Sequence, residues 1–426
     1  MQKAFEFEIE MRETIKSQKS SMIYVASGLF RTFMQVIVGF LVLRWIEPSE
    51  LGQWQSLLLM STYLSIFTLG TTSAINRELP FLLGQNQEEK ALGYLSSVGF
   101  FTEILSWSFV ILAGVMGVFF WIIEWYKWDF CAELVLASIH GAINIQTNFI
   151  GATFRTSSSF QKVGKIQFLI AIGYVALIPM IYFGNIGGYI LYQTILAVLL
   201  YLGYWWNRPF KVKYKWNFEE LKHMVKEGFH LYIWNYLSTV SKSFPRLALV
   251  VFANPYSVGL YAPAQNVNTA ILNLPGLLNR ILFPKMAFKF GQSGEAREVI
   301  KSAMKWAGII FVLMSFIAIG LSLVIPWVFK DFFPKYIDST NVAIVALWAG
   351  VLYSVNSIFQ LTITSIKAHK DLHFFIIMRF VFLALGLVLG FLFHWNWLMV
   401  VSLSALFAEV LNVFHGLFIL RKKLLS

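Results

Sequence analysis

The stretch Pro48-Ser49-Glu50-Leu51-Gly52-Gln53-Trp54 returns later in the chain as Pro255-Tyr256-Ser257-Val258-Gly259-Leu260-Tyr261. The two stretches share the pattern Pro-x-x-aliphatic-Gly-x-aromatic. A second stretch, Gly84 to Lys90, returns as Gly291 to Arg297, and both second copies begin 207 residues after the first, close to half of the 426 residues. Two matches at one offset and in the same order indicate a duplicated unit, which in a chain this apolar is typical of transporters.

The composition excludes an ordinary soluble protein, since 58% of the residues are hydrophobic and only 13% are charged. Several apolar runs exceed about 18 residues, enough to cross roughly 30 Å of hydrocarbon as a helix. We therefore expect an all-α polytopic membrane protein with about twelve transmembrane helices. The expected spans lie near residues 21–46, 54–77, 94–121, 131–154, 164–184, 187–206, 229–252, 258–284, 303–328, 338–366, 374–393 and 397–420.

The net charge of +12 follows the expected topology rather than a nucleic-acid surface. With both termini in the cytoplasm, most of the 34 Lys and Arg residues lie inside, and Lys127, Lys330 and Lys335 lie outside. Cys131 is the single cysteine and cannot form an intramolecular disulfide. The first twenty residues lack the apolar core of a removable signal peptide. We expect a membrane protein that binds no nucleic acid.

The spans divide into two halves of six around a basic cytoplasmic linker, which attracts anionic lipids. The expected parts are an N-terminal segment 1–20, an N-lobe 21–206, the linker 207–228, a C-lobe 229–420 and a tail 421–426. With six spans in each half, the halves are parallel copies related by an axis along the membrane normal. The repeated Pro turns then lie on the outer face and the repeated Gly-Gln segments on the inner face.

Short motifs along the chain resemble one family. They are the repeated Pro turn after spans one and seven, Val258 to Ala264, Leu274-Pro275, Leu282-Phe283-Pro284 and Phe333-Pro334-Lys335-Tyr336. These motifs resemble polysaccharide flippases, the Wzx-like members of the multidrug/oligosaccharidyl-lipid/polysaccharide exporter superfamily. Many relatives carry an acidic residue before the arginine of span seven, where this chain has Phe244-Pro245-Arg246.

The resemblance implies two six-helix lobes around a central cavity in a bacterial cytoplasmic (inner) membrane. It also implies movement of an undecaprenyl-pyrophosphate-linked oligosaccharide from the cytoplasmic to the outer leaflet. The expected partners are this lipid-linked substrate, membrane lipids and other polysaccharide assembly proteins. The sequence has no metal-ligand spacing and no Walker-type phosphate loop, so we expect no metal, no cofactor and no enzyme activity.

Charged residues deep in the spans are the first candidates for a substrate site, because a charge at the bilayer centre costs about 2.5–3.5 kcal/mol on insertion scales. Arg31 shares a helix face with Ser27 and Gln35. Lys242 and Arg246 share a face of span seven, beside a proline, Pro245, that is expected to kink the helix and serve as a gate. We expect the cations Arg31, Lys242 and Arg246 to bind the diphosphate. The alternatives are an ion pair between Arg31 and Glu103, a lysine that snorkels to water, and an arginine bonded to neighbouring helices.

Other polar residues have secondary roles. Gln35, Thr269 and Asn273 are candidates for the polar cavity lining, with helix packing as the alternative. Arg77, Arg280 and Arg379 lie near the inner ends, where they snorkel or meet the arriving head group. Glu103 and Glu409, at mid-depth, are candidates for coupling to an ion gradient or for pairing with Arg31 or Lys242.

These features favour a flippase that works by alternating access. A multidrug exporter of the same superfamily is the nearest alternative, although cationic drugs would favour acidic cavity residues. A membrane-embedded assembly enzyme or scaffold is a further alternative. The short external connections argue against an enzyme, and the intramembrane arginines against a scaffold.

Overall fold

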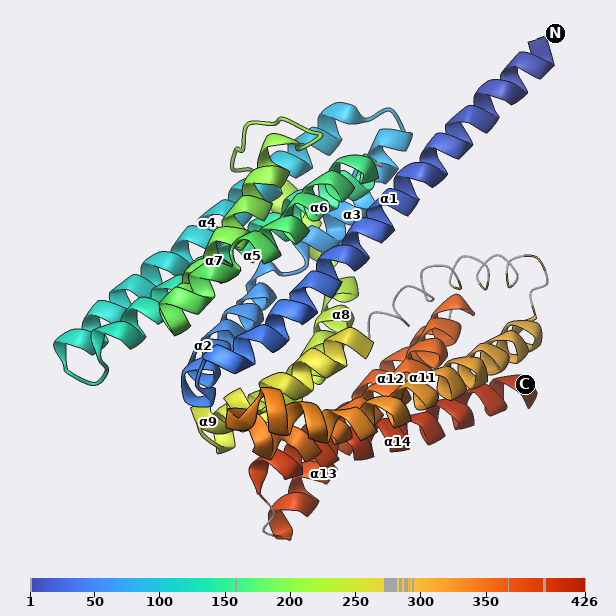
Figure 1. Cartoon of the computed structure of the whole chain (residues 1–426). Helices are drawn as coiled ribbons and strands as arrows, with labels where there is room; N and C mark the ends of the chain where they lie inside the picture. Colours follow the sequence, from blue (N-terminus) through green and yellow to red (C-terminus); the bar gives the residue numbers. More distant parts are fainter. Residues whose placement is uncertain are drawn as a thin grey trace. The chain divides into compact units, whose positions relative to one another are not determined.

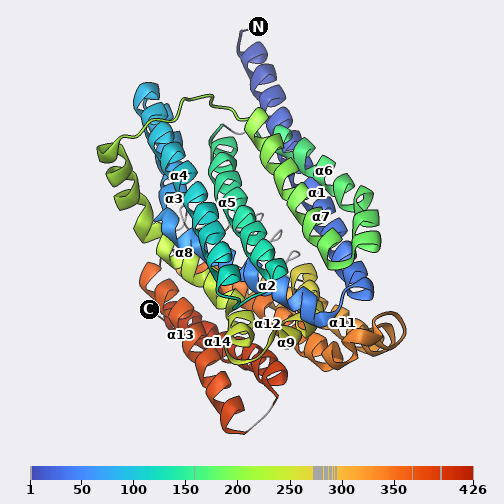
Figure 2. The ribbon, with the colours of Figure 1, turned by 90° about the vertical axis from the view of Figure 1, so that its left-hand side faces the viewer.

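A computed structural model gives the arrangement of the helices (Figures 1 and 2). It describes residues 2–157, 159–271, 295–366, 368–393 and 396–425, with Leu282, Met286, Phe290 and Gln292. The regular structure in these residues is helical, with no strand, which confirms the all-α class. The helices are α1 Gln2–Trp45, α2 Pro48–Tyr63, η1 Leu64–Thr68, α3 Thr71–Gly84, α4 Glu88–Ile122, α5 Trp128–Thr156, α6 Phe160–Ala176, α7 Ile178–Trp206, α8 Phe218–Phe252, α9 Pro255–Leu260, α11 Ala296–Phe332, η2 Pro334–Ser339, α12 Thr340–Ser365, α13 His369–Leu392 and α14 Trp397–Leu425.

Seven helical segments in the described residues are long and apolar enough to cross a membrane. An eighth crossing is added if α2–η1 and α3, which meet at a bend of 49°, form one broken span. The helices α5 and α8, of 29 and 35 residues, are not among these apolar segments. The count of twelve spans therefore stays a prediction.

The helix boundaries differ from expectation between residues 160 and 206. The expected span 164–184 is divided, because α6 ends at Ala176 and Ile178 begins α7. Pro179 lies at the start of α7, where its missing N–H does no harm but where it cannot continue the preceding helix. Asn185 then breaks α7 with a left-handed φ of 48°. This break falls at the expected gap between residues 184 and 187.

The contacts divide the chain into two units, each with its own internal packing. Unit 1 comprises Met1–Val38 and Leu57–Tyr236, and unit 2 comprises Gly39–Ser56 and Leu237–Ser426. In unit 1, α4 packs on α5, and α5 contacts α3 and α7. In unit 2, α14 packs on α12 and α13, and α11 packs on α12. The expected lobes 21–206 and 229–420 stay a prediction.

A bend in unit 1 separates η1 from α3. Gly70 occupies it with a φ of 80°, which is accessible to glycine without strain. A Cβ added at Gly228 of α8 would overlap the carbonyl oxygen of Gly70, so only glycine permits this approach. The hydroxyl of Tyr232 donates to the carbonyl of Ser65 at 2.6 Å, and so satisfies a backbone acceptor inside the bend. The broken span is therefore stabilised by the first half of α8.

The repeated Pro-x-x-aliphatic-Gly-x-aromatic turns lie together in unit 2. Pro48 begins α2 and Pro255 begins α9, the first-turn position in which proline is favoured. A Cβ on Gly52 would overlap the carbonyl oxygen of Pro255, and a Cβ on Gly259 would overlap that of Pro48. The aliphatic and aromatic positions of both copies are buried: Leu51, Trp54, Val258 and Tyr261. The two copies thus contact each other reciprocally, glycine of one against proline of the other.

Candidate functional site

Unit 1 contains a polar cavity of about 210 Å³, bounded by α1, α5, α6 and α7. Its polar lining residues are Tyr24, Arg31, Asn144, Thr147, Asn148, Arg155, Gln167 and Tyr204. Two of these are arginines, and no carboxylate belongs to the lining that the structure describes. The cavity therefore favours an anionic or hydroxyl-rich ligand over a cation.

Helix α5 supplies one polar wall of this cavity. Asn144, Asn148, Gly151 and Arg155 are spaced by 4, 3 and 4 residues, which places them on one helix face. The Nε of Arg155 donates to the Oδ1 of Asn76 at 3.0 Å, and this bond fixes the guanidinium. Sequence reasoning missed Arg155, although its 4-3-4 spacing from Asn144 was a usable indication.

Three buried polar atoms around the cavity have no hydrogen-bond partner among the described residues. They are the Nε of Arg31, the Oγ1 of Thr147 and the Oε1 of Gln167. A buried polar group left unpaired costs about 1–3 kcal/mol, and a charged group more. Such atoms beside a cavity indicate that water or a polar ligand completes their bonding.

The other residues predicted near Arg31 lie elsewhere. Ser27 turns back to donate to the carbonyl of Tyr24 at 3.0 Å, and Gln35 is exposed. Glu103 is exposed on α4, and within the described part of the chain no ion pair joins it to Arg31. The guanidinium of Arg31, which lines the cavity, is therefore not neutralised by Glu103.

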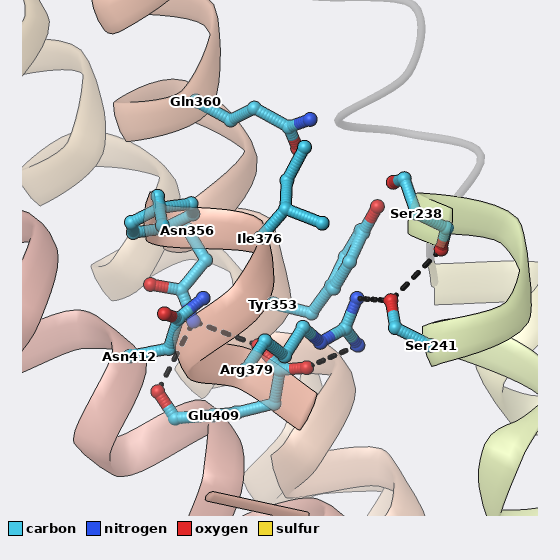
Figure 3. A pocket seen from close by; sticks show the side chains of 10 residues that line it. Ser238, Ser241, Tyr353, Asn356, Gln360, Ile376, Arg379, Glu409 and Asn412 are labelled. Atoms are coloured by element: carbon cyan, nitrogen blue, oxygen red, sulfur yellow. Dashed lines mark hydrogen bonds and ion pairs between the residues drawn. The ribbon is translucent and has the colours of Figure 1, made fainter. Parts of the chain in front are cut away.

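Unit 2 contains a buried polar cluster built from α8, α12, α13 and α14 (Figure 3). Arg379 forms an ion pair with Glu409, and its Nη1 donates to the Oγ of Ser241 at 3.1 Å. The Nδ2 of Asn356 donates to Glu409 Oε2 at 2.7 Å and to the Glu409 carbonyl at 3.1 Å. The carboxylate of Glu409 thus joins α14 to α12 and α13, and the bond from Arg379 to Ser241 adds α8.

Two cations, Arg379 of this cluster and the exposed Lys242, lie close to the aromatic ring of Tyr353. The guanidinium carbon of Arg379 lies 4.9 Å from the ring centroid and the Nζ of Lys242 5.4 Å, both within range of a cation–π interaction. The cluster encloses a pocket of about 10 Å³, roughly the space of one water. The Oδ1 atoms of Asn356 and Asn412, which have no partner in the described structure, belong to residues that line it.

The cations predicted on α8 lie in different surroundings. Lys242 is exposed apart from its contact with Tyr353, whereas the Nη1 of Arg246 donates to the Oε1 of Gln265 at 2.8 Å. Pro245 is buried, and α8 continues through it from Phe218 to Phe252.

The remaining candidates are dispersed. The hydroxyl of Thr269 donates to the carbonyl of Gln265 at 2.9 Å. Arg77 is exposed and lies 3.4 Å from carboxylate oxygens of Glu78 and Glu227. Asn273 and Arg280 lie outside the described residues. The functional roles of all these residues stay predictions.

Comparisons with known proteins find a matching family and several solved structures with a similar fold. A family model described as polysaccharide biosynthesis protein matches residues 41–338. No curated protein sequence matches the chain. The lipid II flippase MurJ, in an inward closed conformation, has a similar structure with a TM-score of 0.73 at 14% identity, over 95% of this chain and 89% of MurJ.

Two further solved structures are similar over nearly the whole chain. An inward-facing multidrug resistance MATE family transporter of the MOP superfamily gives a TM-score of 0.71 at 14% identity, over 95% of this chain and 98% of that one. A MOP superfamily transporter from Pyrococcus furiosus with a binding pocket of reverse polarity gives 0.63 at 12% identity, over 96% of each chain. These solved structures are transporters and flippases rather than enzymes. The family match covers more than half of the chain, so this multi-pass membrane protein belongs to the polysaccharide biosynthesis protein family.

Proposed function

We propose that the chain is a flippase that moves undecaprenyl-pyrophosphate-linked oligosaccharide units from the cytoplasmic to the outer leaflet by alternating access. Two findings support this proposal: the family is one of polysaccharide biosynthesis, and MurJ, a flippase for lipid II, has a similar fold. The flipped units would serve the assembly of O-antigen, capsule or exopolysaccharide. The protein would lie in a bacterial cytoplasmic membrane with both termini inside, next to other polysaccharide assembly proteins.

The cationic cavity of unit 1 is the observation that carries the proposal. Sugar hydroxyls and a diphosphate are very costly to move through hydrocarbon without hydrogen bonds. Arg31 and Arg155 offer planar guanidinium groups, which bind phosphate oxygens in a bidentate manner. Asn144, Asn148 and Gln167 offer amides to sugar hydroxyls. The lipid tail would stay in the bilayer.

A multidrug exporter of the same superfamily is the second candidate, since a MATE transporter has a similar fold. Cationic drugs require acidic groups, and the described lining of the unit 1 cavity has two arginines and no carboxylate. The Pyrococcus furiosus transporter gives a precedent, because the reverse polarity of its binding pocket suggests a different function. Cavity polarity therefore favours the flippase.

The other predicted residues have supporting roles in this proposal. Lys242 and Arg246 supply a second cationic group on α8, with Pro245 between them as a gate. Arg77 and Arg280 meet the arriving head group, and Arg379 would join them only when its buried pair with Glu409 opens. Coupling to an ion gradient would act through Glu409, whose pair with Arg379 must then open, or through the exposed Glu103. Gln35, Thr269 and Asn273 would line the transport path.

Leaflet-resolved measurement of the lipid-linked oligosaccharide tests the proposal. We expect deletion of the gene to trap this lipid on the cytoplasmic face, and Arg31→Ala at normal expression to restore at most a tenth of the flipping rate, of the order lost with one charged hydrogen-bonding group. Arg44→Ala, which removes an exposed arginine from the last turn of the same helix, is the matched control and should restore nearly full flipping. An unchanged lipid distribution in the deletion strain, with altered drug efflux, would overturn the flippase in favour of the exporter.

A further inference from the structure

The irregular segment 207–217 between α7 and α8 is fastened to the side of α4 in unit 1 (Figure 2). The Oγ of Ser96 accepts a hydrogen bond from the backbone N–H of Lys215 at 2.9 Å. The same hydroxyl donates to the carbonyl of Lys213 at 2.7 Å. One side chain thus holds two peptide groups of the segment, which is therefore more than a loose tether.

Tyr214 anchors the segment between these two bonds. Its ring lies so close to Gly99 of α4 that a Cβ there would overlap it. The ring also packs edge-on against Phe149 and Trp205, with centroids 6.0 and 6.1 Å apart. Burial raises the pKa of Tyr214, so the phenol stays protonated and neutral. The register of the segment on α4 is fixed by this ring.

The fixed register turns three lysines outward. Val212 and Tyr214 are half-buried, whereas Lys211, Lys213 and Lys215 are exposed. Side chains alternate in an extended chain, so the three lysines, named here the lysine face, project to one side about 6.6 Å apart. Among the described residues, no ion pair neutralises these lysines, and the carboxylates that form ion pairs do so with other cations.

Aromatic side chains flank the lysine face. Trp206 at the end of α7, Trp216 two residues before α8 and Phe218 at the start of α8 are all exposed. Exposed tryptophans at helix ends are typical of the membrane–water interface, where the ring meets both acyl chains and head groups. The segment joins the ends of two long helices, and these rings place it at head-group level. A soluble acidic protein would give no reason for them.

We propose that the lysine face is a docking surface for the head groups of anionic phospholipids in the adjacent leaflet. The phosphates bind the three lysines while Trp206 and Trp216 enter the interface beside them. Each lysine at an anionic surface strengthens binding about fivefold, so three strengthen it on the order of a hundredfold, less at high salt. Because Ser96 and Tyr214 order the segment beforehand, little conformational freedom is lost on binding. The surface is independent of the transport activity proposed above.

Lipid binding by the purified full-length protein tests this surface. The protein, in nanodiscs of phosphatidylcholine, is titrated with fluorescent phosphatidylglycerol and with fluorescent phosphatidylcholine. We expect the substitutions Lys211→Gln, Lys213→Gln and Lys215→Gln together to lower the preference for the anionic lipid by tenfold or more. The matched control, Lys162→Gln, Lys165→Gln and Lys222→Gln together, removes three other exposed lysines and should change it less than threefold.

A second variant tests whether lipid binding needs the ordered backbone of the segment in addition to the charges of its lysines. Ser96→Ala keeps every lysine but removes both hydrogen bonds that hold the segment, and we expect it to lower the preference severalfold. Equal losses in the two lysine variants would overturn the proposal in favour of net charge alone. No loss in Ser96→Ala would overturn the role of the ordered segment. Capture of poly-glutamate in preference to phosphatidylglycerol would assign the surface to an acidic protein instead.

Discussion

Arg379 and Glu409 neutralise each other inside unit 2, with side chains only 14% and 4% exposed. Asn356 donates a hydrogen bond to Glu409 and Arg379 donates one to Ser241, whereas the Nε of Arg379 has no partner among the described residues. Replacing a whole buried ion pair by apolar groups is often nearly neutral, whereas removing one partner leaves an unpaired buried charge. We therefore expect the loss of one partner to lower the free energy of unfolding more than the replacement of both.

Single and double substitutions test this coupling. We expect Arg379→Met or Glu409→Gln alone to lower the free energy of unfolding by about 3–5 kcal/mol, and the double variant to lose clearly less than the sum. Arg77→Met removes an exposed arginine from its pairs with Glu78 and Glu227, and should cost no more than about 1 kcal/mol. The free energies of unfolding of these four variants are measured by denaturation in detergent. Additive losses in the double variant would show that the two residues are not coupled.

At this scale the sequence identified charges but not their partners. Arg31 was selected from its spacing to Ser27 and Gln35, and the structure places it at a cavity. Arg155 is not among the predicted residues, and it lies in the last turn of α5, a position from which an arginine ordinarily snorkels to the interface. The sequence offers Arg31 or Lys242 as partners of Glu409, whereas the structure pairs Glu409 with Arg379. The rotation of each helix against its neighbours decides such pairs, and spacing within one helix does not reveal it.

Among the elements, the two Pro turns depend on a close backbone crossing. Gly52 lies against the carbonyl of Pro255, and Gly259 lies against the carbonyl of Pro48. The sequence predicted both turns from their shared pattern. It did not predict that the copies contact each other, because a repeat specifies equal local structure and not mutual packing. The glycines of the pattern are explained only by this contact.

Alanine at either glycine should separate the two turns. We expect Gly52→Ala and Gly259→Ala each to lower the free energy of unfolding by about 1–3 kcal/mol, because backbone atoms and not a flexible side chain must move. Gly114→Ala in α4 is the matched control, since a Cβ there meets nothing within 4 Å. It should be neutral or stabilise by roughly 0.5–1 kcal/mol, as alanine favours the helix. Unfolding midpoints for Gly52→Ala equal to those of Gly114→Ala would refute the crossing.

For the whole molecule, hydropathy identifies the helices that face lipid and underestimates those that face polar clusters. Helix α5 has 29 residues, roughly 43 Å at 1.5 Å per residue, which exceeds the hydrocarbon thickness. Its polar face lines the unit 1 cavity, so its average hydropathy falls short. Helix α8 is similar, because Ser238 and Ser241 face the unit 2 cluster. The helical pattern at 131–154 and 229–252 predicted both helices. Both are long enough to cross a membrane, and that they do so stays a prediction.

The number of crossings can be decided by the sides on which two exposed tyrosines lie. Tyr126 and Tyr256 flank four of the twelve predicted spans, those near 131–154, 164–184, 187–206 and 229–252. An even number of crossings places both on the same side, the outside by the distribution of Lys and Arg. If α7, the one segment between them that is apolar enough by composition, crossed alone, they would lie on opposite sides. Whether an even or an odd number of crossings separates Tyr126 from Tyr256 can therefore be measured directly.

Single cysteines provide that measurement. Cys131 is buried and is the single native cysteine, so Cys131→Ser gives a background without thiols. We expect Tyr126→Cys and Tyr256→Cys to react with a membrane-impermeant maleimide on intact cells, and Gln87→Cys to react only after permeabilisation. Gln87 precedes α4, five predicted spans from Tyr256, and lies on the inner side in the twelve-span topology. Labelling of Tyr126→Cys without Tyr256→Cys, when both react in permeabilised cells, would exclude twelve spans, and with them the parallel arrangement of the halves.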